Sequence, residues 1–147
     1  IKGCGQGSAI SNEKLIGLEC DFLIPAALGG VIHKMNVEEL NCKVVVEAAN
    51  GPVTPTADKK LFEKNIHVVP DILTNAGGVT VSYFEWVQNL QQLQWDESEV
   101  NEKLEKKMVS AFREVSSLME QRKTSMRMAA FAVAIDRVAQ AYALRGI

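Results

Sequence analysis

The sequence has no excess of positive charge and very little histidine. Its 16 lysines and arginines are outnumbered by 18 aspartates and glutamates, which gives a formal net charge of −2. A protein that follows a nucleic-acid backbone normally carries a surplus of basic residues, so we expect no nucleic-acid partner. The only two histidines, His33 and His67, stand alone in the sequence. An isolated histidine is more often structural than a ligand, and we assign these two no chemistry.

Cysteine is also scarce. Cys4, Cys20 and Cys42 are odd in number and widely spaced, and none belongs to a C-x-x-C motif. This pattern indicates neither a disulfide framework nor a zinc site, so we predict no metal site. Reduced thiols in an intracellular protein fit best.

Long apolar runs are missing as well. The most apolar helical stretch extends from Met128 to Ile135, where Asp136 and Arg137 interrupt it. It is far too short to span a bilayer, and we expect no membrane partner. No charged region followed by an apolar run resembles a signal segment, which favours the cytoplasm, with the mitochondrial matrix as the alternative. Because the chain starts at Ile1 and not at Met, we expect it to be a piece of a longer protein.

The residues that are present predict an α/β fold in a single domain. With 147 residues, 47% hydrophobic and 23% charged, the chain has the composition of a globular domain. Short apolar runs rich in β-branched residues predict buried strands at 20–24, 43–47 and 67–70. Helical patterns lie between them, and strands that alternate with helices predict a parallel sheet.

The intervening helices have recognisable signals. Ser11 and Asn12 are typical of a helix start, residues 37–40 provide about one turn, and a helix that begins at Thr56 is predicted to turn Leu61 and Phe62 inward.

From residue 73 onward the pattern is helical only, so we divide the chain into alternating strands and helices (1–72) and a helical tail (73–147). Asp96 is a predicted N-cap, with Glu99 three residues later. The helix that follows carries apolar residues on one face: Val100, Leu104, Met108, Ala111, Phe112, Val115 and Met119. A last helix is predicted from about Ser125 to Arg145, with Gly146 as its C-terminal stop.

Small residues and asparagines follow the three predicted strands. Ala26 and Ala27 follow the first strand, Asn50 follows the second and Asn75 the third. Ligands of open parallel sheets bind beyond the carboxyl ends of the strands, where small residues admit a ligand and carboxamides both donate and accept hydrogen bonds. Each motif alone also fits tight packing or a turn, but its recurrence at all three strand ends favours a binding edge.

The stretch NAGGVTVSYFEWVQNL, residues 75–90, carries the most information. Its apolar spacing fits a helix, although the V-T-V-S-Y alternation also fits a strand; we favour the helix. Gly77 and Gly78 would then lie at the helix N-terminus, which favours an anionic ligand. Val79 and Ser82 would share the adjacent face, where the Ser82 hydroxyl either contacts a carboxylate or is simply solvated.

These motifs resemble the glutamate dehydrogenase family, which also includes leucine, phenylalanine and valine dehydrogenases. The similar segments are CDFLIPAALGGVI, VVVEAANGPVTPTADKKL, NAGGVTVSYFEWVQN and RMAAFAVAIDRVAQAYALRG, in that order along essentially the whole chain. The resemblance implies the C-terminal half of a Rossmann-like, doubly wound parallel sheet with about three strands, followed by long helices. The LGGVI and LRG details are most similar to the NAD-specific, plant-like branch.

The resemblance also implies roles for individual residues. Ala26, Ala27, Asn50 and Asn75 would contact the nicotinamide and ribose of NAD or NADP, with NAD favoured. Val79 and Ser82 would line the substrate pocket, with the Ser82 hydroxyl on the distal carboxylate of glutamate. Relatives that act on branched-chain amino acids carry an apolar residue at the Ser82 position, so serine favours glutamate as substrate.

The opening glycines, Gly3, Gly5 and Gly7, look like a phosphate-binding loop but do not fit one. A dinucleotide fingerprint has G-x-G-x-x-G/A after a strand, whereas here the third glycine comes one position early and only two residues precede the first. The resemblance places the true phosphate loop, the catalytic lysine and the catalytic aspartate outside this sequence.

The implied parent enzyme oxidises L-glutamate to 2-oxoglutarate and ammonia as a homo-oligomer. We assign no catalytic residue to this chain and expect it to be inactive alone. The competing hypothesis is a non-catalytic α/β module that acts as an assembly scaffold.

Overall fold

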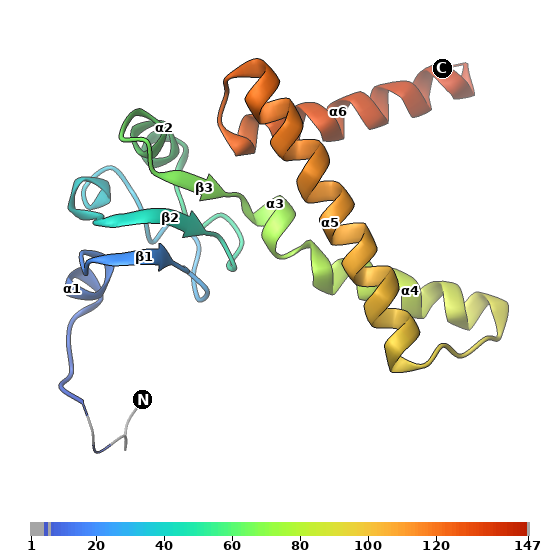
Figure 1. Cartoon of the computed structure of the whole chain (residues 1–147), viewed down its shortest axis with the longest axis horizontal. Helices are drawn as coiled ribbons and strands as arrows, with labels where there is room; N and C mark the ends of the chain where they lie inside the picture. Colours follow the sequence, from blue (N-terminus) through green and yellow to red (C-terminus); the bar gives the residue numbers. More distant parts are fainter. Residues whose placement is uncertain (1–4, 6, 147) are drawn as a thin grey trace.

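The computed structural model describes residue 5 and residues 7–146; Gly3 and Cys4 therefore lie outside the described residues. A small sheet with short helices comes first, and three long helices extend from it (Figure 1). The mixed α/β class is confirmed. In chain order the elements are α1 (Asn12–Ile16), β1 (Cys20–Leu23), the 3-10 turn η1 (Val37–Glu39), β2 (Cys42–Val46), α2 (Pro55–Glu63), β3 (His67–Val69), α3 (Asp71–Thr74), α4 (Ala76–Gln91), α5 (Glu97–Arg122) and α6 (Met126–Arg145).

The sheet has three strands in the order β1-β2-β3, and both strand pairs are parallel. This confirms the predicted parallel sheet. All three strands end within a residue or two of the predicted positions. Pro70, which has no N–H to donate, follows β3 directly and helps to end it.

The strands are less buried than predicted, because neither face of the sheet is covered along its whole length. Laterally paired Leu23, Val45 and Val68 lie on the face that packs into the main core. On the opposite face Phe22 pairs laterally with Val44, and its side chain is 63% exposed. Of the strand residues only Val45 is fully buried, and the others are half-buried or exposed, so the prediction of buried strands was wrong at most positions.

Two separate hydrophobic cores hold the chain. The first joins the sheet to α2 and contains Ile32, Val37, Leu40, Val45, Val53, Ala57, Leu61 and Ile66. The second lies where α3, α5 and α6 meet and contains Leu73, Val115, Ala129 and Ala130.

The structure corrects the predicted inner faces of two helices. In α2, Leu61 is fully buried as predicted, but Phe62 is 51% exposed. Leu61 lies one turn after the buried Ala57, whereas Phe62 is about 100° further round the helix. In α5, Val115 is buried but Phe112 is exposed, because Phe112 lies about 60° round the helix from Val115 and so points away from the second core.

The predicted ends of the long helices are confirmed. The Asp96 carboxylate caps α5 by accepting a hydrogen bond of 2.8 Å from the Glu99 N–H. Gly146 ends α6 with a φ of 71°, a left-handed conformation that glycine adopts without steric cost. The segment after Asn75 is helical, as α4. No helix among residues 7–146 is both long and apolar enough to cross a membrane.

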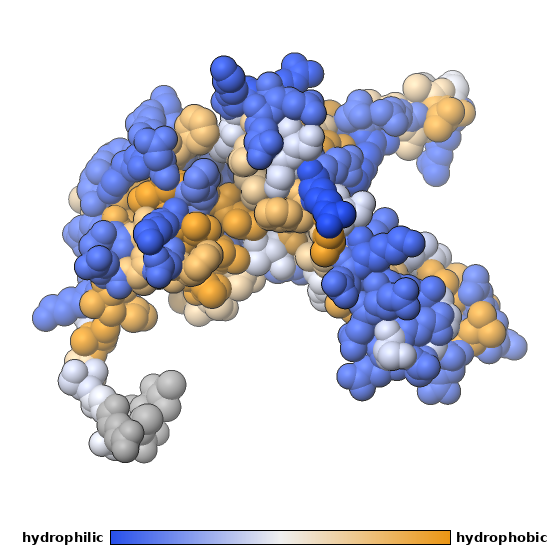
Figure 2. Space-filling model, viewed as in Figure 1, coloured by the Kyte–Doolittle hydropathy of each residue, from blue (hydrophilic) through white to orange (hydrophobic). Residues whose placement is uncertain are grey.

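Helix α6 projects away from the sheet in Figure 1 and carries an uncovered apolar stripe. Phe131, Ile135, Val138 and Tyr142 recur at helical spacing and are all exposed. Figure 2 shows hydrophobic surface at several places beside hydrophilic surface, including on the projecting end of α6.

This exposed stripe predicts that the isolated chain self-associates, because a contiguous apolar surface is stabilised by leaving water. Sedimentation velocity over a concentration series should show oligomers that Ile135→Lys weakens. Gln140→Lys adds the same charge on another face of α6 and should leave the association unchanged. A chain that is monomeric throughout the series would contradict this prediction.

Candidate functional site

The loops that follow β1 and β2 are joined by backbone hydrogen bonds at the carboxyl end of the sheet. The Pro25 carbonyl accepts from the N–H groups of Ala48, at 3.1 Å, and Ala49, at 2.9 Å. The Pro25-Ala26-Ala27 segment is thereby held beside the Ala48–Ala49 segment. The small side chains that were predicted after two different strands therefore lie together.

The two asparagines after β2 and β3 contact each other directly. The Asn75 side-chain amide donates to the Asn50 Oδ1 at 2.7 Å and to the Ala48 carbonyl at 3.4 Å. A carboxamide can make up to four hydrogen bonds, so the pair retains capacity for a ligand.

These loops and the start of α4 line an open cavity of about 580 Å³. Its floor is made of small residues, and at Gly29 the backbone passes so close that an added Cβ would lie 3.1 Å from the Asn50 carbonyl oxygen. The lining residues are Ala27, Leu28, Gly29, Ala48, Ala49, Asn50, Asn75 and Val79.

Four of the six predicted site residues therefore share one cavity: Ala27, Asn50, Asn75 and Val79. Val79 is 69% exposed and lies one turn after Asn75. Ala26 is exposed beside the cavity and does not line it. Ser82 is exposed on α4 outside it, and its hydroxyl donates to the Gly78 carbonyl at 3.1 Å.

Sequence reasoning missed a buried ion cluster behind this cavity. Glu47, directly after β2, is fully buried, and its Oε1 accepts a hydrogen bond of 2.6 Å from the Nη2 of Arg127 near the start of α6. The Arg127 Nε donates at 3.0 Å to Asp58 in α2, and its Nη1 lies 3.5 Å from Asp71. One guanidinium thus contacts carboxylates from three elements of the first half of the chain.

The cluster continues into the cavity loops. The second Glu47 oxygen accepts from the Asp71 N–H at 2.8 Å, and the Asp71 Oδ2 accepts from the Gly51 N–H at 2.7 Å. Gly51 adopts a φ of 55°, so the turn after Asn50 has a conformation that suits glycine. The turn is fixed by a carboxylate 20 residues further along the chain.

The electrostatics of Arg127 follow from these contacts. Burial by itself would lower the pKa of Arg127, but the hydrogen bond to Glu47 and the charge and hydrogen bond of Asp58 outweigh it, so the pKa is raised. The sequence did contain a signal for this cluster. Glu47 directly follows the apolar residues of a strand that was predicted to be buried, and a buried carboxylate requires a partner of opposite charge or a hydrogen-bond donor.

The residues around the cavity suit the nicotinamide and ribose end of a dinucleotide. A floor of alanine and glycine admits a flat ring close to the backbone, and the Asn50–Asn75 pair offers donors and acceptors for an amide or hydroxyl groups. A parallel sheet with a cavity at its carboxyl edge is the arrangement found in dinucleotide-binding α/β proteins.

Comparison with known proteins identifies the family. The family model for glutamate/leucine/phenylalanine/valine dehydrogenase matches residues 2–146, and the chain belongs to this family. It is 55% identical over 142 residues to the glutamate dehydrogenase of Thermotoga maritima, an alignment that covers 97% of the chain and 34% of that protein. It is 51% identical over 137 residues to the NAD-specific glutamate dehydrogenase of Staphylococcus aureus, covering 93% and 33%.

The fold is similar too. The crystal structure of the hetero-hexameric glutamate dehydrogenase of Thermus thermophilus, in a leucine-bound form, superposes with a TM-score of 0.89 at 35% identity and covers 94% of the chain and 33% of that structure. The chain therefore spans about a third of the length of these relatives.

Proposed function

We propose that this chain is the C-terminal part of the coenzyme-binding domain of a glutamate dehydrogenase. The complete enzyme would convert L-glutamate to 2-oxoglutarate and ammonia while NAD or NADP is reduced. The observation that carries this proposal is the shared cavity of Ala27, Asn50, Asn75 and Val79 in a chain that is 51–55% identical to named glutamate dehydrogenases.

In this proposal the chain supplies one wall of the active-site cleft. When bound, the nicotinamide cofactor supplies the hydride acceptor. Asn50 and Asn75 orient its amide and ribose, Ala26 and Ala27 pack against it, and the small residues exclude water from that side. The chain contributes orientation, and the acid–base groups come from the remainder of the polypeptide.

Val79 and Ser82 are the proposed substrate contacts. They lie three residues apart on α4, whose N-terminal turn contains Gly77 and Gly78. The free N–H groups and dipole of that terminus favour the negative charge of a carboxylate. Val79 would pack on the aliphatic part of glutamate, with the Ser82 hydroxyl on its distal carboxylate.

Coenzyme preference, assembly and location are proposed as well. NAD is the proposed preference, supported by the NAD-specific name of the Staphylococcus aureus relative. A homo-oligomer in the cytoplasm is proposed for the complete enzyme, with the mitochondrial matrix as the alternative location.

Replacement of Asn75 by alanine in the complete enzyme tests the cofactor wall. Loss of its hydrogen bonds should raise the dissociation constant of NADH by about five- to tenfold, since a neutral hydrogen bond contributes roughly 1 kcal/mol. NADH fluorescence titration measures this directly. Asn89→Ala removes an exposed carboxamide near the C-terminal end of α4, and this variant should bind NADH with the affinity of wild type. Unchanged affinity in Asn75→Ala would remove Asn75 from the proposed site.

A further inference from the structure

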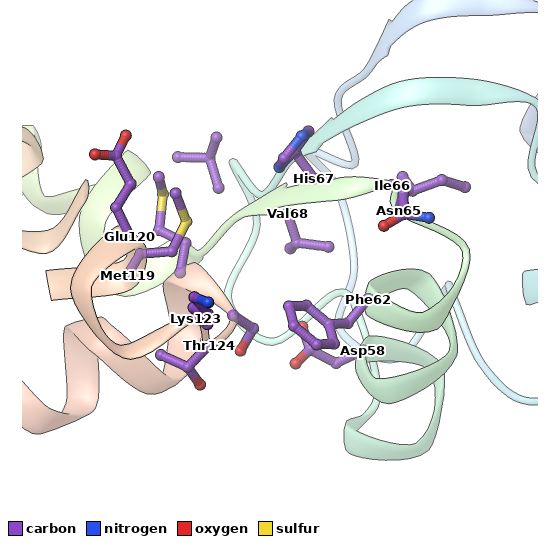
Figure 3. Close-up of a pocket in the computed structure, with 13 residues that line it drawn as sticks. Asp58, Phe62, Asn65, Ile66, His67, Val68, Met119, Glu120, Lys123 and Thr124 are labelled. Carbon is purple, nitrogen blue, oxygen red and sulfur yellow. The ribbon is translucent and has the colours of Figure 1, made fainter. Parts of the chain in front are cut away.

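Apolar packing joins the sheet to the helical tail at β3, where Val69 packs against the second core. Their two hydrophobic cores are separate, and a cavity of about 420 Å³ lies between α2, β3 and the end of α5. Figure 3 shows Asp58 and Phe62 of α2 on one side of it, and Met119, Lys123 and Thr124 on the other. Arg127 lies three residues after Thr124. Through the buried ion cluster it connects the helical tail to the part of the chain that contains the sheet.

We propose that Arg127 is a positioning residue, which reaches from the helical tail to hold both asparagine loops in the geometry that binds the cofactor. This inference rests on the proposed cofactor role of Asn50 and Asn75. Arg127 lines a different cavity from Asn50 and Asn75 and would act on them through Glu47 and Asp71.

The path from Arg127 to each asparagine is short. Toward Asn50, Arg127 binds Glu47, which lies three residues before Asn50, and the Asp71 carboxylate holds the N–H of Gly51 directly after it. Toward Asn75, Glu47 fixes the Asp71 N–H at the start of α3, and the Asp71 carbonyl accepts from the Asn75 N–H at 3.0 Å. The Asn75 to Asn50 hydrogen bond closes the ring of contacts.

The chemistry of the cluster requires arginine. Arg127 has a side chain only 17% exposed and directs separate nitrogens to Glu47, Asp58 and Asp71. A lysine carries the same charge on a single nitrogen, without the planar fork that reaches three carboxylates at once. Arg127→Lys therefore keeps a cation beside Glu47 while removing part of the positioning.

The test compares Arg127→Lys with wild type in the complete enzyme. The dissociation constant of NADH is expected to rise about tenfold in Arg127→Lys, as charge-assisted hydrogen bonds that fix the loops are lost. Arg137→Lys is the matched control: Arg137 is an exposed arginine of the same helix that pairs with Glu114, and its replacement should leave NADH affinity unchanged. Thermal unfolding identifies a temperature at which all variants are fully folded, and affinities are measured there.

A double-mutant cycle separates positioning from general stability. If Arg127 acts through the asparagines, Arg127→Lys should have little further effect on NADH affinity once Asn50 and Asn75 are both alanine. A purely structural role would lower the melting temperature and leave the affinity of the folded protein intact. Should Arg127→Lys fail to fold, Arg127→Met combined with Glu47→Gln removes the cation together with the fully buried carboxylate and is measured in the same cycle.

The outcomes distinguish this inference from the proposed function. Native NADH affinity in folded Arg127→Lys, or effects that are fully additive with the Asn50→Ala/Asn75→Ala pair, would overturn the positioning role while the asparagine variants by themselves still support the cofactor wall. If the Asn50→Ala/Asn75→Ala pair binds NADH like wild type, the proposed wall fails, and the positioning role fails with it.

Discussion

The isolated 147-residue chain is expected to show no glutamate-dependent reduction of NAD or NADP. It spans about a third of its relatives, and its described residues form one side of a cavity that is open to solvent. Positioning of two reactants and acid–base help each contribute several orders of magnitude, and a single wall provides neither in full. The measurement is absorbance of the reduced cofactor at saturating glutamate.

The complete enzyme, purified in the same way, is the positive control and should turn over both substrates. Activity of the isolated chain that survives rigorous purification and scales with its concentration would contradict this expectation. Such activity would mean that the residues described above already contain an acid–base group for glutamate oxidation.

The second large effect is expected from Ser82→Ala in the complete enzyme. Loss of a hydrogen bond to the charged distal carboxylate should lower kcat/KM for glutamate by about ten- to a hundredfold, because such bonds contribute roughly 1.5–3 kcal/mol. Cofactor affinity should hardly change. In this structure the Ser82 hydroxyl donates to the Gly78 carbonyl. A hydroxyl has one hydrogen, so it must rotate away from Gly78 to donate to substrate.

Norvaline, which lacks the distal carboxylate, provides the internal comparison. Its kcat/KM should be little affected by Ser82→Ala, since no hydrogen bond is lost. Ser117→Ala is a suitable control variant, because Ser117 is also an exposed helix serine and makes its hydrogen bond within α5. If glutamate and norvaline lose efficiency equally, Ser82 does not contact the distal carboxylate and is a solvated helix serine.

Local signals were sufficient to predict the secondary structure. Apolar runs of β-branched residues located β1, β2 and β3, and the Asp96 and Gly146 signals located helix ends. These features depend on neighbouring residues, which the sequence displays directly. Phe62 and Phe112 were assigned to inner faces incorrectly, because a helix pattern shows which residues are apolar but not how much of the helix is covered.

The candidate site was predictable only in part. Ala27, Asn50 and Asn75 were correctly predicted to lie at one edge of the sheet, because each follows the carboxyl end of a parallel strand and such strands end at the same edge. Ala26 and Ser82 lie outside the resulting cavity, because the direction of each side chain depends on loop and helix geometry. The family resemblance supplied the proposed roles, which the chemistry of alanine and asparagine alone leaves open.

The sequence by itself determined the α/β class, the parallel sheet and the family, because strand and helix periodicity and the order of the motifs are written in neighbouring residues. Only the tertiary structure revealed that Arg127 is held by Glu47, Asp58 and Asp71, residues 56 to 80 positions away in the chain. Such a cluster depends on how α2, α3 and α6 pack around the end of β2. No local pattern encodes that packing, and the buried charge of Glu47 is stabilised only once the helical tail has folded against the sheet.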